Sequence, residues 1–380
     1  SEIKQLKIVK QSVDARKKEQ ILFIYTVDVE VAKESQILKK VKNNQVSQVK
    51  ETPYQFPTDG EEPLKHPPVI IGSGPAGLFC GLMLAQAGYH PILLERGQNV
   101  EQRQKDVELF WNTGVLNTRS NVQFGEGGAG AFSDGKLNTL VKDPLKRNQK
   151  VLEILVEHGA DPEILYVNKP HIGTDVLSKV VKNIREHIID LGGQVFFESQ
   201  VTDMTIKDGR ITALEINGDQ PEKRKILEAE AVVLAVGHSA RDTFSMLLDR
   251  KVPMEQKAFA VGLRIQHPQK MINLSQYGRE EAGALGAANY KLTRQTKSGR
   301  GVYSFCMCPG GYVVNASSEA GRLAVNGMSY HDRAGENANS ALIVTVTPED
   351  YPEGGALGGV AFQRKLEEAA YRAAGGRIPV

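Results

Sequence analysis

The sequence has few cysteines, a single tryptophan and no long apolar run. Three cysteines in 380 residues cannot build a disulfide framework, which favours a reducing compartment. No stretch approaches the roughly eighteen apolar residues of a membrane-spanning helix, and the N-terminus lacks a signal-peptide pattern. We therefore expect a cytoplasmic protein that does not enter a membrane.

The chain also carries little net charge. A formal charge of +2 gives no reason to expect nucleic acid or an anionic membrane as a partner. The first fifty residues hold eleven Lys and Arg against six Asp and Glu, an excess that we interpret as solvated surface. Phe23 and Tyr25 are an aromatic pair there, and we attribute both to core packing, so we expect no nucleic-acid binding.

Residues 69–97, VIIGSGPAGLFCGLMLAQAGYHPILLERG, have the order strand, glycine turn, helix and strand. Gly72 permits the tight turn, Gly74 lets a pyrophosphate approach the backbone, and Gly77 allows the helix to pack on the sheet. The N-terminus of the helix directs N–H groups and a positive dipole end at the phosphates. Glu95 ends the second strand, where a carboxylate accepts hydrogen bonds from ribose hydroxyls. This combination predicts a dinucleotide site.

Several features favour FAD over NAD as the dinucleotide. NVQFGEGGAGAFSDGKLNT holds five glycines between Gly125 and Gly135, so its backbone can approach a large planar or anionic ligand. No second glycine turn is followed by a strand and an acid, which leaves NADH or NADPH as a transient electron donor only. The negative charge of Glu95 disfavours a dinucleotide that carries a 2′-phosphate. The positive charge of Arg96 beside it weakens that inference. AEAVVLAVG, apolar throughout, predicts a strand covered on both faces that ends near the cofactor.

Two other segments have clear local patterns. Apolar residues from Thr174 to Leu191 recur on one helical face, which predicts an amphipathic helix opened by Thr174 or Asp175. Asp208 and Gly209 predict the turn between two extended strands.

The sequence resembles the bacterial family of uncharacterised FAD-dependent dehydrogenases, NAD(P)/FAD-dependent oxidoreductases of the glutathione-reductase-type FAD superfamily. The resemblance rests on eight segments: KQSVDARKK, GSGPAGLFCGL, SNVQFGEGGAGAFSDGKLNT, KPHIGTD, GHSARDTF, FAVGLRIQHPQ, GRGVYSFCMCPGG and ASSEAGRLAVNGMSYHDR. It implies a ferredoxin-like N-terminal domain, a split FAD domain, an inserted substrate domain and an oxidoreductase activity. The superfamily completes its flavin site with a glycine-rich segment near the C-terminus. None follows FQRKLEEAAYRAA, so we expect a fragment of a longer chain.

The predicted fold class is α/β, with a Rossmann-like FAD-binding domain on a central parallel sheet. An inserted substrate domain with a mixed β-sheet and a small N-terminal α+β domain complete the expected architecture. The predicted divisions are an N-terminal domain over 1–50, a proline-rich linker over 51–67, the FAD-binding domain over 68–250, the substrate domain over 251–350 and a truncated return toward the FAD domain over 351–380.

We assign cofactor binding to the glycine turn, the end of the second strand, the glycine-rich loop and the ends of two later strands. The residues are Gly72, Gly74, Pro75, Ala76, Gly77, Glu95, Arg96, Gly125, Glu126, Gly127, Gly128, Lys136, Val201, Ala235 and Gly237. We predict no metal site.

Five residues are candidates for chemistry beside the flavin. Lys136 is either a surface lysine or a positive charge near the flavin, and His238 is a candidate proton donor. Cys306 and Cys308 lie two apart in an expected strand and so share a face, either as small buried hydrophobes or as thiols close to the flavin. His331 is a candidate for binding a polar or carboxylate substrate.

These patterns predict an FAD-dependent oxidoreductase that transfers a hydride or an electron pair between FAD and an unidentified small organic substrate. The alternative is an FAD-binding redox sensor or binding protein whose basic N-terminal domain contacts a partner. A third possibility is a thiol–flavin enzyme that uses Cys306 or Cys308.

Overall fold

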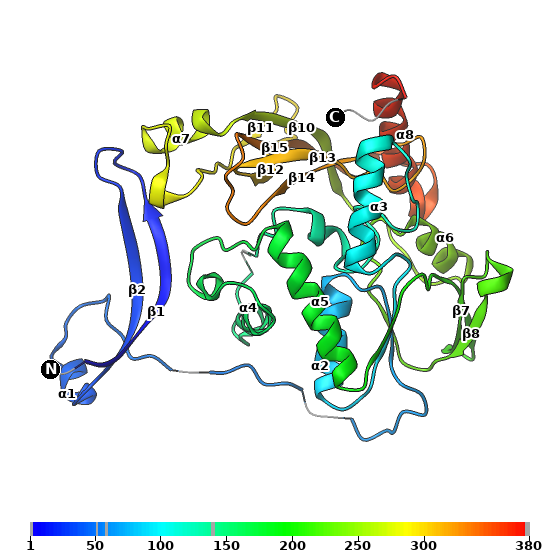
Figure 1. Ribbon diagram of the computed structural model, residues 1–380, viewed down its shortest axis with the longest axis horizontal. Coiled ribbons are helices and arrows are strands. Elements are labelled where there is room, and N and C mark those ends of the chain that lie inside the picture. The colour runs from blue at the N-terminus through cyan, green and yellow to red at the C-terminus, as the bar shows by residue number, and fades with distance from the viewer. Residues whose placement is uncertain (1–2, 51, 58–59, 138–140, 377–380) are drawn as a thin grey trace.

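The computed structural model describes residues 3–50, 52–57, 60–137 and 141–376 (Figure 1). It is a mixed α/β structure with one parallel sheet and several antiparallel sheets, which confirms the predicted class. Within the described ranges, no helix has both the length and the apolar character needed to cross a membrane.

A four-stranded parallel sheet in the order β5-β4-β3-β9 lies at the centre of the fold. Its strands are β3 (Val69–Ile71), β4 (Ile92–Leu94), β5 (Gln194–Phe196) and β9 (Val232–Leu234). The predicted strand, glycine turn, helix and strand are confirmed, because β3 leads through Gly72 into α2 (Pro75–Gln86) and then β4. Consecutive side chains of a strand face opposite sides of the sheet, and both sides of β3 are buried.

The two faces of this sheet belong to two hydrophobic cores. On one face, Ile70 and Leu93 pack against α2 and α5 (Thr174–Asp190), with α4 (Arg147–Glu157) beyond them. On the other face, Val69 and Ile71 pack against an antiparallel sheet and helix α6. These elements are β6 (Val201–Lys207), β7 (Arg210–Ile216), β8 (Lys225–Glu228) and α6 (Arg241–Asp249).

Three local predictions meet different outcomes. The turn at Asp208 and Gly209 is confirmed, and both residues have positive φ, 51° and 75°. The expectation that β9 is covered on both faces is wrong: Val233 and Leu234 are 36% and 45% exposed, because β9 is the edge strand of the sheet. The residue that caps α5 is Gly173, at φ 82°, because Thr174 is already helical and its hydroxyl donates to the Ala131 carbonyl instead.

A second antiparallel sheet, in the order β10-β15-β12-β11, forms the layer at the top of Figure 1. Its strands are β10 (Phe259–Pro268), β11 (Thr293–Gln295), β12 (Gly301–Cys308) and β15 (Asn337–Val346). A separate hairpin of β13 (Gly311–Asn315) and β14 (Val325–Ser329) packs near it. Three further helices belong to the main body: α3 (Val100–Thr113), α7 (Gln269–Tyr277) and α8 (Gly358–Ala373). All described pairings in these two sheets are antiparallel, where a mixed sheet was expected.

The N-terminal segment is an extended hairpin that stands at one side of the molecule (Figure 1). It consists of β1 (Ile3–Asp14), β2 (Leu22–Val31) and the short helix α1 (Glu34–Lys40), fewer elements among the described residues than a ferredoxin-like βαββαβ domain has. Phe23 and Tyr25 are 38% and 49% exposed, so the attribution of this pair to core packing is wrong. The backbone of Gln11 pairs with Tyr166 and Asn168 of the main body.

Candidate functional site

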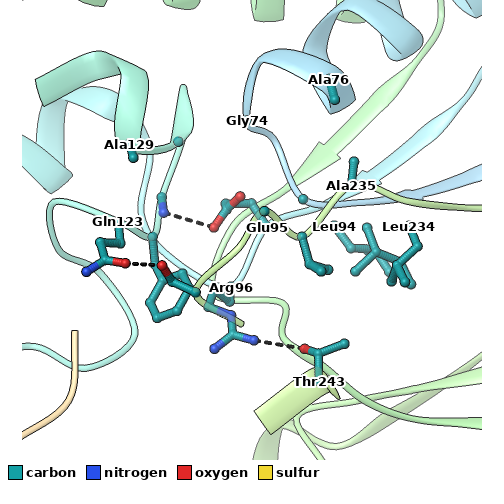
Figure 2. A pocket seen from close by; sticks show the side chains of 18 of the residues that line it. Gly74, Ala76, Leu94, Glu95, Arg96, Gln123, Ala129, Leu234, Ala235 and Thr243 are labelled. Carbon is teal, nitrogen blue, oxygen red and sulfur yellow. Dashed lines mark hydrogen bonds between the residues drawn. The ribbon is translucent and has the colours of Figure 1, made fainter. Parts of the chain in front are cut away.

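A cleft with a volume of about 450 Å³ lies at the carboxyl ends of β3, β4 and β9, where parallel α/β sheets bind ligands. The glycine turn, the glycine-rich loop and the segment after β9 supply most of its walls (Figure 2). Of the predicted residues, the following line it: Gly72, Gly74, Pro75, Ala76, Glu95, Arg96, Gly125, Gly128, Val201, Ala235, Gly237 and His238.

At the base of the cleft, the Glu95 carboxylate connects the glycine turn, the turn after β4 and the glycine-rich loop by hydrogen bonds. One carboxylate oxygen accepts hydrogen bonds from the N–H and the hydroxyl of Ser73, at 2.8 and 2.9 Å. The other accepts from the N–H groups of Gly97 and Gly125, at 2.9 and 3.0 Å. A carboxylate has about four acceptor positions, so all are used within the protein, and Glu95 is only 4% exposed. The Ser73 hydroxyl is the one donor of the four that can rotate away to admit a ribose hydroxyl. The ribose contact stays a prediction.

The glycine turn and the glycine-rich loop approach each other closely at Gly74 and Gly128. A Cβ on Gly128 would lie 3.1 Å from the Cα of Gly74, and Gly128 has a φ of +59° that favours glycine. Gly77 stands behind this point, because a Cβ there would lie 1.9 Å from the Gly72 carbonyl oxygen. Gly77 therefore sets the packing of α2 on the sheet and does not line the cleft.

The N-terminus of α2 faces the cleft without a compensating side chain. Gly74 is its N-cap, no side chain caps the helix, and the first turn holds no acidic residue. Uncapped N–H groups and the positive end of the helix dipole form an anion site. Such a helix end in the wall of the cleft fits the pyrophosphate of a dinucleotide.

Arg103 of α3 holds the glycine-rich loop in place. Its guanidinium is fully buried and donates to the carbonyls of four loop residues, at 2.6 to 3.3 Å: Asn121, Val122, Gly125 and Glu126. Burial lowers the pKa of Arg103 to about 10, while Glu95 and Glu126 oppose that change. Sequence reasoning did not identify Arg103, because nothing in the polar pattern of its helix distinguishes it from a solvated arginine.

Glu126 and Gly127 are not among the residues that line the cleft, and their assignment to cofactor binding stays a prediction. The Glu126 carboxylate is fully buried, accepts from the Val100 N–H at 2.8 Å and lies 3.3 Å from Nε of Arg185. Burial raises the pKa of Glu126 to about 7, against the opposing charge of Arg185. The N–H of Gly127 donates to the Ser73 carbonyl at 2.9 Å, so both residues brace the loop from behind.

Arg96 and His238 form polar walls of the cleft. The guanidinium of Arg96 pairs with Asp242 at 2.9 Å, donates to the Thr243 hydroxyl at 3.1 Å and lies 4.3 Å from the Phe124 ring centre (Figure 2). His238 is exposed, and its Nδ1 lies 2.9 Å from the Ser239 hydroxyl. His238 is the one candidate catalytic residue that lines the cleft.

The other four candidate catalytic residues lie outside the cleft lining. The Lys136 ammonium is 2.6 Å from the buried Asp134 carboxylate and 3.7 Å from the Cys308 sulfur, and its assignment to the cofactor stays a prediction. Cys306 lies in the same cluster, close to Cys308.

His331 packs beside His171, with ring centres 5.6 Å apart. Its Nδ1 lies 2.9 Å from the Ile172 carbonyl, so one ring nitrogen serves a structural contact. Burial and the nearby charge of Arg333 lower the pKa of His171 to about 4, which keeps that ring neutral at physiological pH.

The cleft also includes residues that sequence reasoning missed: Ile71, Leu94, Gln123, Phe124, Ala129, Gly130, Ser199, Gln200, Leu234, Val236, Ser239 and Thr243. Gln123, Phe124 and Gly130 belong to the glycine-rich loop, so an assignment of the whole loop would have found them. Ser199 and Gln200 precede β6 in a segment with no recognisable motif, and only the fold brings them to the site.

Two segments of the chain match known families. Residues 258–380 match the family "FAD-dependent protein, C-terminal domain-like", and residues 1–30 match a domain of unknown function. An uncharacterised protein of Clostridium beijerinckii is 50% identical over 377 residues, which cover 99% of this chain and 69% of that protein.

Solved structures resemble the chain less closely. The flavin-dependent halogenase CmlS superposes with a TM-score of 0.39 at 15% identity, over 80% of this chain and 44% of that one. THI4 of Thermovibrio ammonificans superposes with a TM-score of 0.31 at 20% identity, over 49% of this chain and 63% of that one. The chain thus spans less than two thirds of either structure, and neither is similar enough to assign a role to its residues.

Proposed function

The chain belongs to one family with the Clostridium beijerinckii protein, and on that premise we propose that it is an FAD-dependent oxidoreductase. The cleft is the observation that carries the proposal: two glycine loops, joined by Glu95, meet an uncapped helix N-terminus at the ends of parallel strands. The match of residues 258–380 to an FAD-dependent protein family supports the choice of FAD. When bound, FAD supplies reversible two-electron transfer. The reaction passes a hydride or an electron pair to or from a small organic substrate, with NADH or NADPH as transient donor.

The chain's own residues account for binding in a Rossmann-like arrangement. Gly74 and Gly128 let the two loops meet closely in the wall of the cleft, and the positive end of α2 beside them offsets the charge of the pyrophosphate. Glu95 fixes the spacing of the two loops, and Arg96 adds a cation to the wall of the cleft. His238 is the proton donor of this proposal, because it lines the cleft and is open to solvent.

The test is FAD binding by the purified full-length protein, followed as a flavin absorption spectrum and by equilibrium titration. Gly74→Val places a branched side chain between the two loops, and its φ of −68° accepts any residue, so the fold should survive. We expect FAD affinity to fall by at least about tenfold, which corresponds to roughly 1.4 kcal/mol.

Gly60→Val is the matched control, because a Cβ at Gly60 meets no atom within 4 Å. It should bind FAD as the wild type does. Anaerobic NADH or NADPH should then bleach the flavin of the wild type. A wild-type protein that stays colourless after reconstitution with FAD contradicts the proposal.

A second candidate function is partner binding by the N-terminal hairpin. The exposed Phe23 and Tyr25 on a basic hairpin favour it, because stacking on nucleic-acid bases uses such pairs. We still expect no retention on immobilised RNA at physiological salt. Retention that falls with rising salt, and that is lost in a Phe23→Ala, Tyr25→Ala double variant, would favour the binding function instead.

A further inference from the structure

Cys306 and Cys308 lie at the end of β12, where a β-bulge interrupts its pairing with β15. Phe305 pairs with Ala341, and Cys308 pairs with Asn339, so the ladder slips by one residue between the two cysteines. Cys306 itself has a φ of 48°, a left-handed conformation rare for a residue with a side chain. Such bends are often part of a functional site and re-aim the side chains that they carry.

The two thiols differ in exposure. Cys308 is fully buried, and its Sγ lies 3.3 Å from the Cys306 carbonyl oxygen. Cys306 keeps part of its surface open to solvent. The Cys306 thiol is therefore accessible to a small reagent, whereas the Cys308 thiol is buried. Neither cysteine forms a disulfide.

Cations outnumber carboxylates around this pair. The Lys136 ammonium lies 3.7 Å and the Arg264 guanidinium 4.0 Å from the Cys308 sulfur. Arg333 pairs with Asp134, the same carboxylate that Lys136 contacts. Lys136 and Arg333 thus share one buried carboxylate, while Arg264 contacts the Cys306 carbonyl and the Asn339 amide oxygen. A partly buried excess of positive charge is costly, and a thiolate is the anion that these residues can supply.

A buried amide donor without a hydrogen-bond partner also indicates a site for negative charge. Asn339 lies opposite Cys308 in β15 and is fully buried. Its side-chain oxygen accepts from Arg264, while its amide nitrogen has no hydrogen-bond partner. Buried polar groups without partners are rare and each needs an explanation. A site that holds negative charge during its working cycle explains both the spare donor and the spare cations.

The acidity of the thiols agrees with this geometry. The pKa of Cys306 is lowered to about 6. The largest cause is a hydrogen bond from the Cys308 thiol, and the charges of Lys136 and Arg264 add to it; together they outweigh the opposite effect of burial. The pKa of Cys308 is raised, because its proton is shared with Cys306 and its thiol is buried. Cys306, the more accessible of the two thiols, is thus also the more acidic one.

We propose that Cys306 and Cys308 form a redox-active dithiol that reduces small hydroperoxides. The Cys306 thiolate attacks the outer oxygen of the O–O bond, and that bond breaks to give Cys306 sulfenic acid and an alkoxide or hydroxide, which takes up a proton. The Cys308 thiol then attacks the sulfenic sulfur and releases water as the disulfide forms. One hydroperoxide gains the two electrons that the two thiols lose, and the products are one disulfide, one alcohol or water, and one further water.

Neighbouring groups suit the second of these steps. Lys136 and Arg264 place positive charge beside the Cys308 sulfur, where it stabilises the thiolate that attacks the sulfenic sulfur. No group of three or more His, Cys, Asp and Glu residues is arranged to hold a metal ion in the described part of the chain, so the thiols have no assembled metal site. The proposal does not rest on FAD, since both sulfurs lie outside the cleft lining.

The first experiment needs no variant. The purified protein is treated with iodoacetamide over a range of pH, and the alkylation rate of each cysteine is followed by peptide mass spectrometry. Cys306 should react at least about tenfold faster than Cys80 at pH 7, because the thiolate is the nucleophile. Its rate should rise to half its maximum near pH 6. Cys80 is the internal control, since burial raises its pKa.

The second experiment uses hydrogen peroxide as the oxidant. One equivalent should lower the mass of the tryptic peptide 301–322 by 2 Da, about the mass of two hydrogens. Cys308→Ser should instead give a sulfenic acid at Cys306 that dimedone traps, and Cys306→Ser should give neither product. Cys80→Ser is the control and should behave as the wild type.

Equal alkylation of Cys306 and Cys80, or a peptide 301–322 that gains only oxygen atoms at Met307, would overturn the proposal. Because both readouts concern the thiols alone, a protein that fails to bind FAD still tests it.

Discussion

The Glu95 carboxylate accepts a hydrogen bond at 3.0 Å from the N–H of Gly125, thirty positions further along the chain. Through this contact the acid at the end of β4 fixes the glycine-rich loop against the glycine turn. Glu95, a residue of the dinucleotide motif, thus also positions the glycine-rich loop on the opposite wall of the cleft.

Glu95→Gln tests this organising role. A Gln side chain replaces one acceptor oxygen with an NH₂ group, which leaves two of the four donors facing a donor. We expect the free energy of unfolding in urea to fall by about 2–4 kcal/mol, because buried donors without acceptors cost about 1–3 kcal/mol each. Glu108→Gln on the exposed face of α3 is the control, because its amide oxygen still accepts from Gln104, and it should change this free energy by less than about 0.5 kcal/mol. Equal stability of both variants would contradict the role of Glu95.

Arg103→Lys tests whether the shape of the guanidinium holds the loop. Lysine keeps the charge but cannot reach the four carbonyls that the planar group serves together. We expect a loss of about 2–4 kcal/mol in urea unfolding, since buried acceptors lose their donors. Arg372→Lys at an exposed position of α8 supplies the matched change without burial. A stable Arg103→Lys protein would show that the loop is held by other contacts.

Gly128→Ala, compared with Gly209→Ala, distinguishes the effect of a side chain in the cleft wall from the effect of backbone strain. The new Cβ would lie 3.1 Å from the Gly74 Cα, where the two loops meet in the wall of the cleft proposed to hold the pyrophosphate. Gly209→Ala has a similar positive φ but meets no atom within 4 Å. Both should lose about 1–2 kcal/mol of stability from left-handed strain. Only Gly128→Ala should weaken FAD binding by at least about tenfold in equilibrium titration. Equal affinities would place the pyrophosphate elsewhere.

Glu126 predicts a pH dependence of stability. Its folded pKa of about 7 lies above the ordinary 4.5, so the folded protein holds this proton between those values while the unfolded chain has lost it. Stability therefore falls as pH rises from about 4.5 to 7 and levels off above, by a total of about 3 kcal/mol from this group.

Glu126→Gln removes that slope. The difference in free energy of unfolding, variant minus wild type, should rise across this range and then stay constant. Urea denaturation at pH 5, 6, 7 and 8 measures it. A difference that does not change with pH would show that Glu126 is ionised throughout.

The nucleotide motif is the part of the site that the sequence predicted well. Gly72, Gly74 and Glu95 follow short strands whose β-branched and leucine side chains are buried, and local sequence determines each of these steps. The strand β9 shows the limit of such reasoning. Its run of apolar residues is typical of a buried strand, yet its position at the edge of the sheet leaves Val233 and Leu234 exposed.

Residues that act across long separations could not be predicted. Arg103 has no signal in the sequence, since its meaning comes from four carbonyls about twenty positions away. The end of the glycine-rich loop suggested Lys136 as either a surface lysine or a charge near the flavin. A shared strand face suggested Cys306 and Cys308 as either buried hydrophobes or thiols near the flavin. Neither pattern indicates that the fold gathers Lys136 and Cys308 beside Asp134.

The sequence by itself determined the strand–turn–helix–strand unit at residues 69–95, because glycine conformations, helix ends and apolar periodicity are properties of neighbouring residues. The tertiary structure alone decided which charged and thiol side chains share a buried space. Coulomb interactions and hydrogen bonds act through distance in space, and the chain brings Lys136 and Cys308 together across 172 positions only when it folds.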